Sequence, residues 1–319
     1  MGEAQSAWSG PPIQVVGMGM SAGMLSPAAR AALDSAELLI GSAAHLAAFP
    51  ALAAEKAPYP SPMSGLAAML NASAGRQIVL LASGDPLFYG ISQTLLRWLP
   101  PKHLVFHPNV SSLQAAFARL GRPWQQAQYV SLHGRPLAGL RAVLHANRCY
   151  ALLTDRDSSP PAIAQLLVET GFGESTLWVA EDLGTAQEQF RQFQAVELAG
   201  AAVGFSPLNV VILETRGRGG VLPEFPGIPD ERFSTGEEPG KGLLSKREVR
   251  LMILSLLAPR AGDIGWDVGA GCGGVSVEWA RWNPQGAVYA VECHPERLKH
   301  LGINRDRFGV IGNLHIIPG

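Results

Sequence analysis

The sequence predicts an α/β protein with two domains, and three observations support this prediction. Short apolar runs end in glycine-rich loops and continue into amphipathic stretches, which is the pattern of strands that alternate with helices. A stretch rich in glycine, proline and charged residues, 216–240, interrupts that pattern. A further glycine-rich turn, 267–274, follows the interruption. With 319 residues, the chain is long enough to build two separate cores.

Composition argues against several classes of protein. The chain is 47% hydrophobic and 16% charged, and its formal net charge of -1 argues against a general nucleic-acid binder. Its 3 cysteines, Cys149, Cys272 and Cys293, are widely spaced and odd in number, which argues against a disulfide framework and a zinc site. Residues 1–12 are expected to be disordered and do not read as a signal peptide, and no apolar run has the length of a membrane span. We therefore expect a cytoplasmic protein without nucleic-acid or membrane partners. We also expect the chain to form a homo-oligomer.

The N-terminal domain, 13–215, begins with a strand and a glycine turn. Residues 13–16 form a buried strand, and the loop that follows runs from Gly17 to Gly23. Ser26 is suited to cap the next helix, and Pro27 to occupy its first position. A plain connection between a strand and a helix has similar glycines, so this turn alone leaves a binding function open.

Two later segments of this domain repeat the arrangement. The apolar run 78–82 leads directly into the small-residue loop 83–90. Val105 and Phe106 lead into a second loop, 107–112, and an amphipathic helix follows. Ligands of open α/β sheets bind at the carboxyl ends of the strands. The loops after these strands are therefore expected to form one wall of a binding pocket.

The second domain, 241–319, follows the linker predicted at 216–240. Residues 245–248, Ser-Lys-Arg-Glu, have the pattern of a capping box that opens a helix. An apolar face of that helix is expected from the spacing of Val249, Met252, Ile253 and Leu256.

The glycine turn of the second domain has the pattern of a nucleotide-binding turn. A short strand, 264–268, leads into glycines that let the backbone approach a ligand closely, and a helix opens behind them. A second strand, 288–291, ends at Glu292, where such folds bind the ribose hydroxyls of an adenosine. The glycine spacing also fits the dinucleotide fingerprint of nicotinamide enzymes. Asp267, two places before the first glycine, favours S-adenosylmethionine (SAM), so a nicotinamide-dependent oxidoreductase is kept as the alternative.

Six ordered motifs between residues 13 and 215 resemble the tetrapyrrole (corrin/porphyrin) methylases, in particular those that act on a precorrin. They are Val15–Gly19, Ala82–Pro86, Pro108–Ser112, Ser131–Arg135, Glu181–Gly184 and Pro207–Val211. The second domain, through Leu244–Arg250 and Trp266–Gly271, resembles the decarboxylating precorrin methyltransferases. The resemblance implies a two-lobed methylase domain with SAM between its lobes, followed by the front half of a doubly wound class I SAM methyltransferase domain.

The resemblance also implies a reaction and its residues. The reaction would be SAM-dependent methylation of precorrin-6B at meso carbons 5 and 15, with decarboxylation of an acetate side chain, in cobalamin biosynthesis. The cofactor-binding residues would be Gly17, Ser83, Gly84, Asp85, Phe88, Ser111, Ser112, Ser245, Gly269, Gly271, Gly273 and Glu292. His133 and Arg135 are candidates for the precorrin substrate. Asn109 departs from the family pattern, where a glycine is common. Catalytic residues remain unassigned, because an electron-rich meso carbon needs little acid–base help to attack a sulfonium.

Acidic and basic residues after the strands have simpler interpretations. Asp155, Asp157, Glu181 and Asp182 each follow an apolar run, where acids usually cap the next turn, so no metal is expected. Arg135, Arg156, Arg247 and Arg250 could bind precorrin carboxylates or could be ordinary surface residues.

Only three strands are expected after the linker, whereas a class I methyltransferase domain has seven. We therefore expect a truncated second domain, an open edge at strand 264–268 and a chain that performs at most one methylation and no decarboxylation. A non-catalytic tetrapyrrole-binding module is the third possible function.

Overall fold

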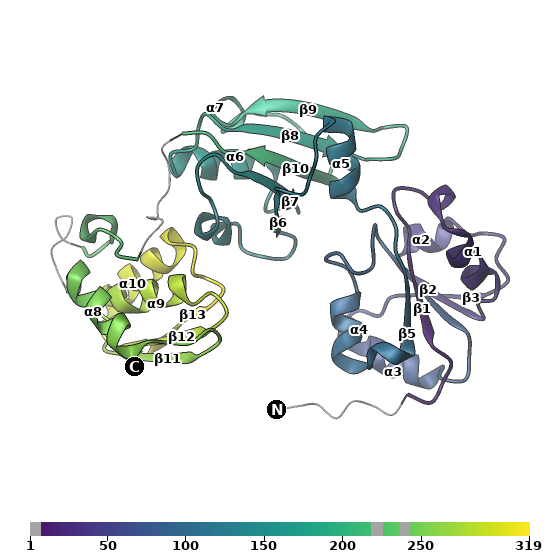
Figure 1. Ribbon diagram of the computed structural model, residues 1–319, viewed down its shortest axis with the longest axis horizontal. Helices are drawn as coiled ribbons and strands as arrows, with labels where there is room; N and C mark the ends of the chain where they lie inside the picture. Colours follow the sequence, from purple (N-terminus) through teal and green to yellow (C-terminus); the bar gives the residue numbers. More distant parts are fainter. Residues whose placement is uncertain (1–7, 218–225, 237–242) are drawn as a thin grey trace. The chain divides into compact units, whose positions relative to one another are not determined.

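The computed structural model describes residues 8–217, 226–236 and 243–319 and contains three sheets (Figure 1). Two compact units divide the chain: Met1–Trp124 with Ala180–Phe190, and Gln125–Val179 with Arg191–Gly319. The α/β fold class predicted from the sequence is confirmed. Among the described residues, no helix is long and apolar enough to cross a membrane.

The first unit contains a parallel five-stranded sheet in the order β3-β2-β4-β1-β5. Its strands are β1 (Ile13–Gly17), β2 (Leu38–Gly41), β3 (Glu55–Pro58), β4 (Ile78–Ala82) and β5 (Leu104–His107). Its helices are α1 (Pro27–Asp34), α2 (Ala43–Ala47), α3 (Leu66–Ala72), α4 (Ser92–Trp98) and α5 (Ser112–Leu120), with short 3-10 turns at Ala22–Met24, Met63–Gly65 and Pro101–His103. The strands predicted at 13–16 and 78–82 are confirmed.

Successive residues of β1, β2 and β4 enter different cores on the two faces of this sheet. On one face, Val15, Leu38 and Leu80 pack with α3 and α4. On the other face, Val16 and Leu39 pack with α1. Burial on both faces explains why these strands are continuous apolar runs. The expected Ser26 cap is present, since its hydroxyl accepts a hydrogen bond from the Ala29 amide at 3.2 Å.

A second sheet has the order β6-β7-β10-β8-β9 and mixes parallel and antiparallel pairs. Its strands are β6 (Gln128–Ser131), β7 (Cys149–Leu153), β8 (Thr176–Glu181), β9 (Gln189–Gln194) and β10 (Asn209–Glu214). The helices α6 (Pro160–Glu169) and α7 (Ala195–Leu198) and a 3-10 turn at Leu137–Ala142 accompany it. Tyr150, Phe172 and Leu213 lie in its core.

The C-terminal part has a parallel three-stranded sheet in the order β11-β12-β13. The strands are β11 (Ile264–Val268), β12 (Ala287–Glu292) and β13 (Leu314–Pro318), and the helices are α8 (Arg247–Leu257), α9 (Gly274–Trp282) and α10 (Pro295–Arg307). Val277, Val288 and Leu301 form its core. The three strands predicted here are confirmed, and β11 is an edge strand of this sheet.

Residues 226–236, part of the predicted linker, are packed against the C-terminal part. They contain a 3-10 turn, Asp230–Arg232. Ile228 and Phe233 are buried in the same core as Val277. The linker prediction was therefore wrong for these residues, because two isolated apolar anchors leave no periodic pattern to detect. The rest of that stretch, 218–225 and 237–240, lies outside the described residues.

Three further expectations, two for α8 and one for the N-terminus, were also wrong. Helix α8 begins after Lys246 without a side-chain cap, so the capping box expected at Ser245 is absent. The predicted apolar face of α8 is largely exposed, as the exposure of Met252 and Leu256 shows. The reason is that the buried side of α8 is the one that carries Arg250. At the N-terminus, Trp8 is buried against the first sheet, so disorder does not extend over 8–12; residues 1–7 lie outside the described residues.

Candidate cofactor sites

The loops that follow β1, β4 and β5 meet at the carboxyl edge of the first sheet. Gly17 has no room for a side chain, since a Cβ atom there would lie 2.6 Å from the Gly84 oxygen and 3.1 Å from Asn109 Cβ. The Gly19 amide donates to the Gly84 oxygen at 3.1 Å. The contact between the β1 and β4 loops therefore depends on glycine at position 17.

Asp85 and Asn109 tie these loops together. One Asp85 carboxylate oxygen accepts a hydrogen bond from the Leu87 amide at 2.8 Å, and the other accepts one from the Asn109 amide at 3.2 Å. The Asn109 side-chain amide donates to the Gly17 oxygen at 2.9 Å. Asn109 thus joins all three loops. In the sequence, Asn109 stood out only as a departure from the family pattern, and this role was not predicted. Asp85 has a clear structural role here, and its contact with a cofactor stays a prediction.

The remaining predicted residues of this site lie in the same loops. Gly84 has a φ of +57°, which favours glycine. Ser111 caps α5 in a capping box with Gln114, and Ser112 is the first residue of that helix. Ser83 is exposed, and Phe88 contacts the Tyr89 ring edge-on. The structure thus gathers Gly17, Ser83, Gly84, Asp85, Phe88, Ser111 and Ser112 around one edge of one sheet.

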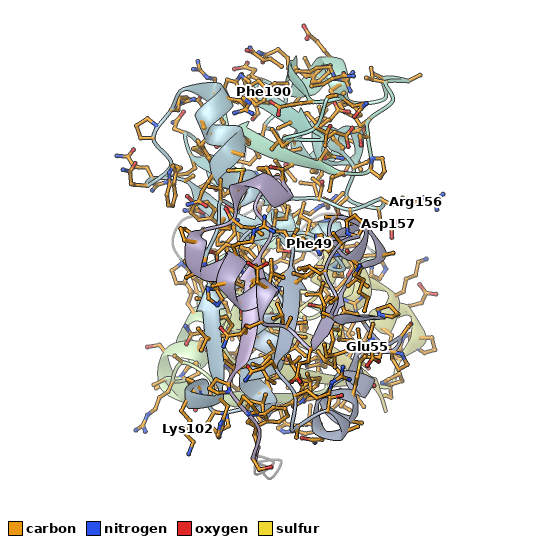
Figure 2. The ribbon with its side chains drawn as sticks, turned by 90° about the vertical axis from the view of Figure 1, so that its right-hand side faces the viewer. Phe49, Glu55, Lys102, Arg156, Asp157 and Phe190 are labelled. Carbon is orange, nitrogen blue, oxygen red and sulfur yellow. The ribbon has the colours of Figure 1, made fainter. Side chains whose placement is uncertain are left out.

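His133 and Arg135 lie in the exposed loop after β6. Asp155 holds this loop, because one of its carboxylate oxygens accepts from the Gly134 amide at 2.7 Å. The other oxygen accepts from the Asp157 and Ser158 amides. Hydrogen bonds from the Ser158 and Gly134 amides lower the pKa of Asp155. The interpretation of Asp155 as a turn-capping acid is supported, and no cluster of potential metal ligands occurs in the described part of the chain. Arg156 and Asp157 are exposed at the surface (Figure 2).

The second glycine loop connects β11 to α9. Gly269, Gly271 and Gly273 have φ values of +80°, +60° and +86°, so all three have the left-handed backbone that glycine adopts most easily. The Gly269 amide donates to the Val291 oxygen at 2.9 Å. Asp267, at the strand end, accepts a hydrogen bond from the hydroxyl of Ser276. The arrangement of strand, glycine turn and helix is the one predicted from the sequence.

Glu292 closes this loop from the end of β12. It is buried, and one carboxylate oxygen accepts from the Gly271 amide at 2.8 Å. The other accepts from the Cys293 and His294 amides, each at 2.9 Å. A carboxylate has about four acceptor positions, so at least one stays available to a ribose hydroxyl. Glu292 therefore shapes the loop, and its contact with a ribose stays a prediction.

Ser245 lies two residues after Leu243, which contacts the same glycine loop. The Leu243 carbonyl accepts a hydrogen bond from the Cys272 amide at 3.4 Å. A Cβ atom on Gly271 would lie 3.0 Å from the oxygen of the same carbonyl. The Ser245 carbonyl accepts a hydrogen bond of 2.5 Å from Arg250. Segment 243–245 therefore borders the loop, and the Ser245 side chain itself is exposed.

Arg250 is a buried structural residue rather than a ligand for substrate carboxylates. Its guanidinium contacts the Asp230 carboxylate at 2.6 Å, the Glu278 carboxylate at 3.4 Å and the Ile228 carbonyl. It also lies over the Phe233 ring, 4.7 Å from the centroid. Glu278 in turn accepts from the Gly227 and Ile228 amides. Together Arg250 and Glu278 hold residues 226–236 against α8 and α9. The possible role of Arg250 in binding a precorrin is therefore excluded by its burial.

Acidification should loosen the second glycine loop. Hydrogen bonds from the backbone amides of His294, Gly271 and Cys293 lower the pKa of Glu292 from its ordinary value of 4.5. Its stabilising contribution is thus fully present above pH 4.5 and is lost as the pH falls through the lower folded-state pKa. We expect hydrogen exchange at the Gly271 amide, corrected for its intrinsic pH dependence, to accelerate only when the pH falls to the folded-state pKa of Glu292. Glu292→Gln should remove this dependence, and an unchanged profile in this variant would show that another group is responsible.

Two family models match the chain, one in each part. A family model described as tetrapyrrole (corrin/porphyrin) methylases matches residues 12–199, more than half of the chain. The chain belongs to this family. A second model, described as a precorrin methyltransferase domain, matches residues 239–319.

Relatives within the methylase family carry more specific names. A precorrin-6Y C(5,15)-methyltransferase (decarboxylating) from Sinorhizobium sp. is 38% identical over 261 residues, which are 81% of this chain and 61% of that protein. The chain therefore spans less than two thirds of this relative's length. A cobalt-precorrin-7 C(5)-methyltransferase from Salmonella typhimurium is 32% identical over 205 residues, its full length and 64% of this chain.

The fold of the methylase family is also found among solved structures. A cobalamin-biosynthesis precorrin-6Y methylase from Archaeoglobus fulgidus superposes with a TM-score of 0.50 and 21% identity. The superposition covers 64% of this chain and 98% of that structure. At this level of identity the likeness concerns the fold alone.

Proposed function

We propose that this protein is a SAM-dependent methyltransferase of cobalamin biosynthesis that acts on precorrin-6B. Its activities would be methylation of meso carbons 5 and 15 and decarboxylation of an acetate side chain. The observation that carries the proposal is the 38% identity over 81% of the chain to a precorrin-6Y C(5,15)-methyltransferase. The two glycine-lined loops at the carboxyl ends of parallel strands support it, because a cofactor can bind at each.

The methylation of carbon 5 belongs to the N-terminal domain in this proposal. The cobalt-precorrin-7 C(5)-methyltransferase aligns over 205 residues, about the length of segment 13–215. Methylation of carbon 15 and decarboxylation then fall to the domain matched by the precorrin methyltransferase model. The homo-oligomeric state and the cytoplasmic location remain predictions from the sequence.

The chain's own residues would act mainly by positioning. SAM carries the methyl group on a positively charged sulfur, and an electron-rich meso carbon can displace it in line. Alignment of the reacting atoms can lower such a barrier by several kcal/mol, up to about 7–11 kcal/mol in the best intramolecular cases. The loops joined by Gly17, Asp85 and Asn109 form a tightly connected support of the kind that such alignment requires. His133 and Arg135, both exposed in the loop after β6, would bind carboxylates of the precorrin.

The experiment that tests the function supplies precorrin-6B with SAM that carries a 13C-methyl group. We expect mass spectrometry to show at least one labelled methyl group added per precorrin, with an equal amount of S-adenosylhomocysteine. A parallel incubation with NADPH tests the oxidoreductase. Reduction of the precorrin at the expense of NADPH, without methyl transfer, would refute the proposal. Tight precorrin binding without any turnover would favour the non-catalytic tetrapyrrole-binding module.

A second prediction concerns Glu292 and SAM binding in the C-terminal domain. Glu292→Ala removes an acceptor for the ribose and frees the Gly271 amide. We expect the affinity of this domain for S-adenosylhomocysteine to fall by about 1.5–3 kcal/mol, the range for hydrogen bonds to a charged group. Calorimetric titration of the chain measures this affinity. The matched control is Glu296→Ala, which removes an exposed acid on α10. Equal affinities for the two variants would exclude Glu292 from the site.

A further inference from the structure

His45 is a titratable side chain at the carboxyl edge of the first sheet. A mechanism that only positions SAM and the precorrin gives it no role. It lies on α2, which follows β2, and Ser83 follows the neighbouring strand β4. His45 Nε2 is 3.4 Å from Ser83 Oγ. The imidazole therefore lies beside one of the loops expected to bind SAM.

The other ring nitrogen of His45 faces the protein interior. Nδ1 is buried and has no hydrogen-bond partner of normal geometry in the described part of the chain. Burial lowers the pKa of His45, and the nearby Leu81 backbone opposes that shift. A neutral ring that carries its proton on Nδ1, toward the Leu81 carbonyl, keeps a lone pair on Nε2. That lone pair is directed at the Ser83 hydroxyl.

The titratable groups around His45 and Ser83 are engaged elsewhere. Helix α2 packs on β2 and β3. On β3, Glu55 pairs with Arg76 at 2.8 Å and Lys56 donates to the Pro50 carbonyl at 3.2 Å. The Tyr59 hydroxyl, next to β3, donates to the Leu81 carbonyl at 2.9 Å.

Asp85 and His107, two titratable groups of the neighbouring loops, are also in use. Both carboxylate oxygens of Asp85 accept backbone hydrogen bonds. His107 Nε2 is bonded to the Gln14 side chain at 2.8 Å. Among these groups, His45 is the one whose free lone pair points to an exposed hydroxyl of the site.

The proposed methylation produces a proton that needs an acceptor. A meso carbon that carries hydrogen attacks the SAM methyl group, so a carbon–carbon bond forms and the carbon–sulfur bond breaks. The carbon must then lose its hydrogen to restore the conjugation of the macrocycle. We infer that His45 accepts this proton through the hydroxyl of Ser83, an inference that rests on the proposed methylation by the N-terminal domain.

The step balances without any further reactant. The electron pair of the carbon–hydrogen bond returns to the macrocycle, and the proton passes to Ser83 Oγ as the hydroxyl proton moves to His45 Nε2. The sulfonium has already accepted the electron pair of its broken bond and leaves as neutral S-adenosylhomocysteine. His45 is partly exposed, so the imidazolium can release its proton to water. Ser83 and His45 then return to their starting state.

The test compares His45→Gln with the wild-type chain in methyl transfer from SAM to precorrin-6B. General base help is worth about 10²–10⁴ in rate, so we expect kcat to fall at least about 100-fold. The KM for the precorrin and the affinity for S-adenosylhomocysteine should stay within about twofold, because glutamine is close in size and remains polar. Added imidazole should restore part of the rate. His103→Gln, on the 3-10 turn before β5, is the matched control and should behave as wild type.

A double-mutant cycle with Ser83→Ala, measured at saturating SAM, tests the path of the proton. Two residues that act in one relay have non-additive effects, so the double variant should be about as slow as the slower single variant. Unchanged kcat in His45→Gln would overturn the inference and leave the proposed function intact. A loss of rate that imidazole does not restore and that adds fully to the Ser83→Ala loss would also overturn it. Absence of methyl transfer by the wild-type chain would refute the proposed function and this inference with it.

Discussion

Arg250→Met is expected to destabilise the C-terminal domain by about 3–5 kcal/mol, the cost of breaking a buried ion pair from one side. Methionine fills a similar volume, but it leaves the fully buried Glu278 carboxylate without its cation and removes the bonds to Asp230 and the Ile228 carbonyl. Residues 226–236 would lose their main anchor. Hydrogen exchange at the Gly227 and Ile228 amides, which donate to Glu278, reports this loss directly.

A matched variant on the same helix separates this effect from a general sensitivity of α8. Arg247 is half exposed and pairs only loosely, at 3.8 Å, with its neighbour Glu248. Arg247→Met should therefore change the stability by less than about 1 kcal/mol. If both variants lower the free energy of unfolding by the same amount, Arg250 does not hold residues 226–236 in place.

Gly17→Ala is expected to weaken SAM binding in the first unit strongly. The added methyl group would lie 2.6 Å from the Gly84 oxygen and 2.9 Å from Pro86 Cδ, so the β1 and β4 loops must move apart. Overpacking of this kind costs about 1–3 kcal/mol in stability. The displaced loops are the ones that Asp85 and Asn109 connect, and we expect the affinity for S-adenosylhomocysteine to fall by more than about tenfold, or 1.4 kcal/mol.

Gly75→Ala provides the control for this substitution. It makes the same chemical change, and its Cβ atom would have no neighbour within 4 Å. Calorimetric titration of both variants with S-adenosylhomocysteine should show a loss only for Gly17→Ala. Retention of wild-type affinity by Gly17→Ala would mean that these loops do not form the cofactor site.

The sequence predicts well what depends on local patterns. The apolar runs 78–82 and 264–268 became strands with the same bounds, because burial on both faces or a following glycine turn leaves a clear local signal. The meeting of the loops after β1, β4 and β5 followed from their position at the ends of parallel strands.

Residues with roles in long-range contacts were predicted poorly. Asn109 was treated as a departure from a family pattern, although its amide connects loops that are 92 residues apart in the chain. Arg250 was expected at the surface or on a substrate, because a charged residue is rarely fully buried unless it is paired with an opposite charge. Its partners Asp230 and Glu278 lie 20 and 28 residues away, at distances that no local pattern reveals.

We propose that each domain has its own SAM site and that the N-terminal domain methylates carbon 5. The most direct test of this assignment locates the transferred methyl groups by 13C NMR of the product. Precorrin-6B would be incubated with 13C-methyl SAM and the wild-type chain, Gly17→Ala or Glu292→Ala. We predict a labelled methyl group on carbon 5 with the wild-type chain and with Glu292→Ala, and none there with Gly17→Ala. Loss of the carbon 5 label in both variants, or its retention in Gly17→Ala, would contradict the assignment of this methylation to the N-terminal domain.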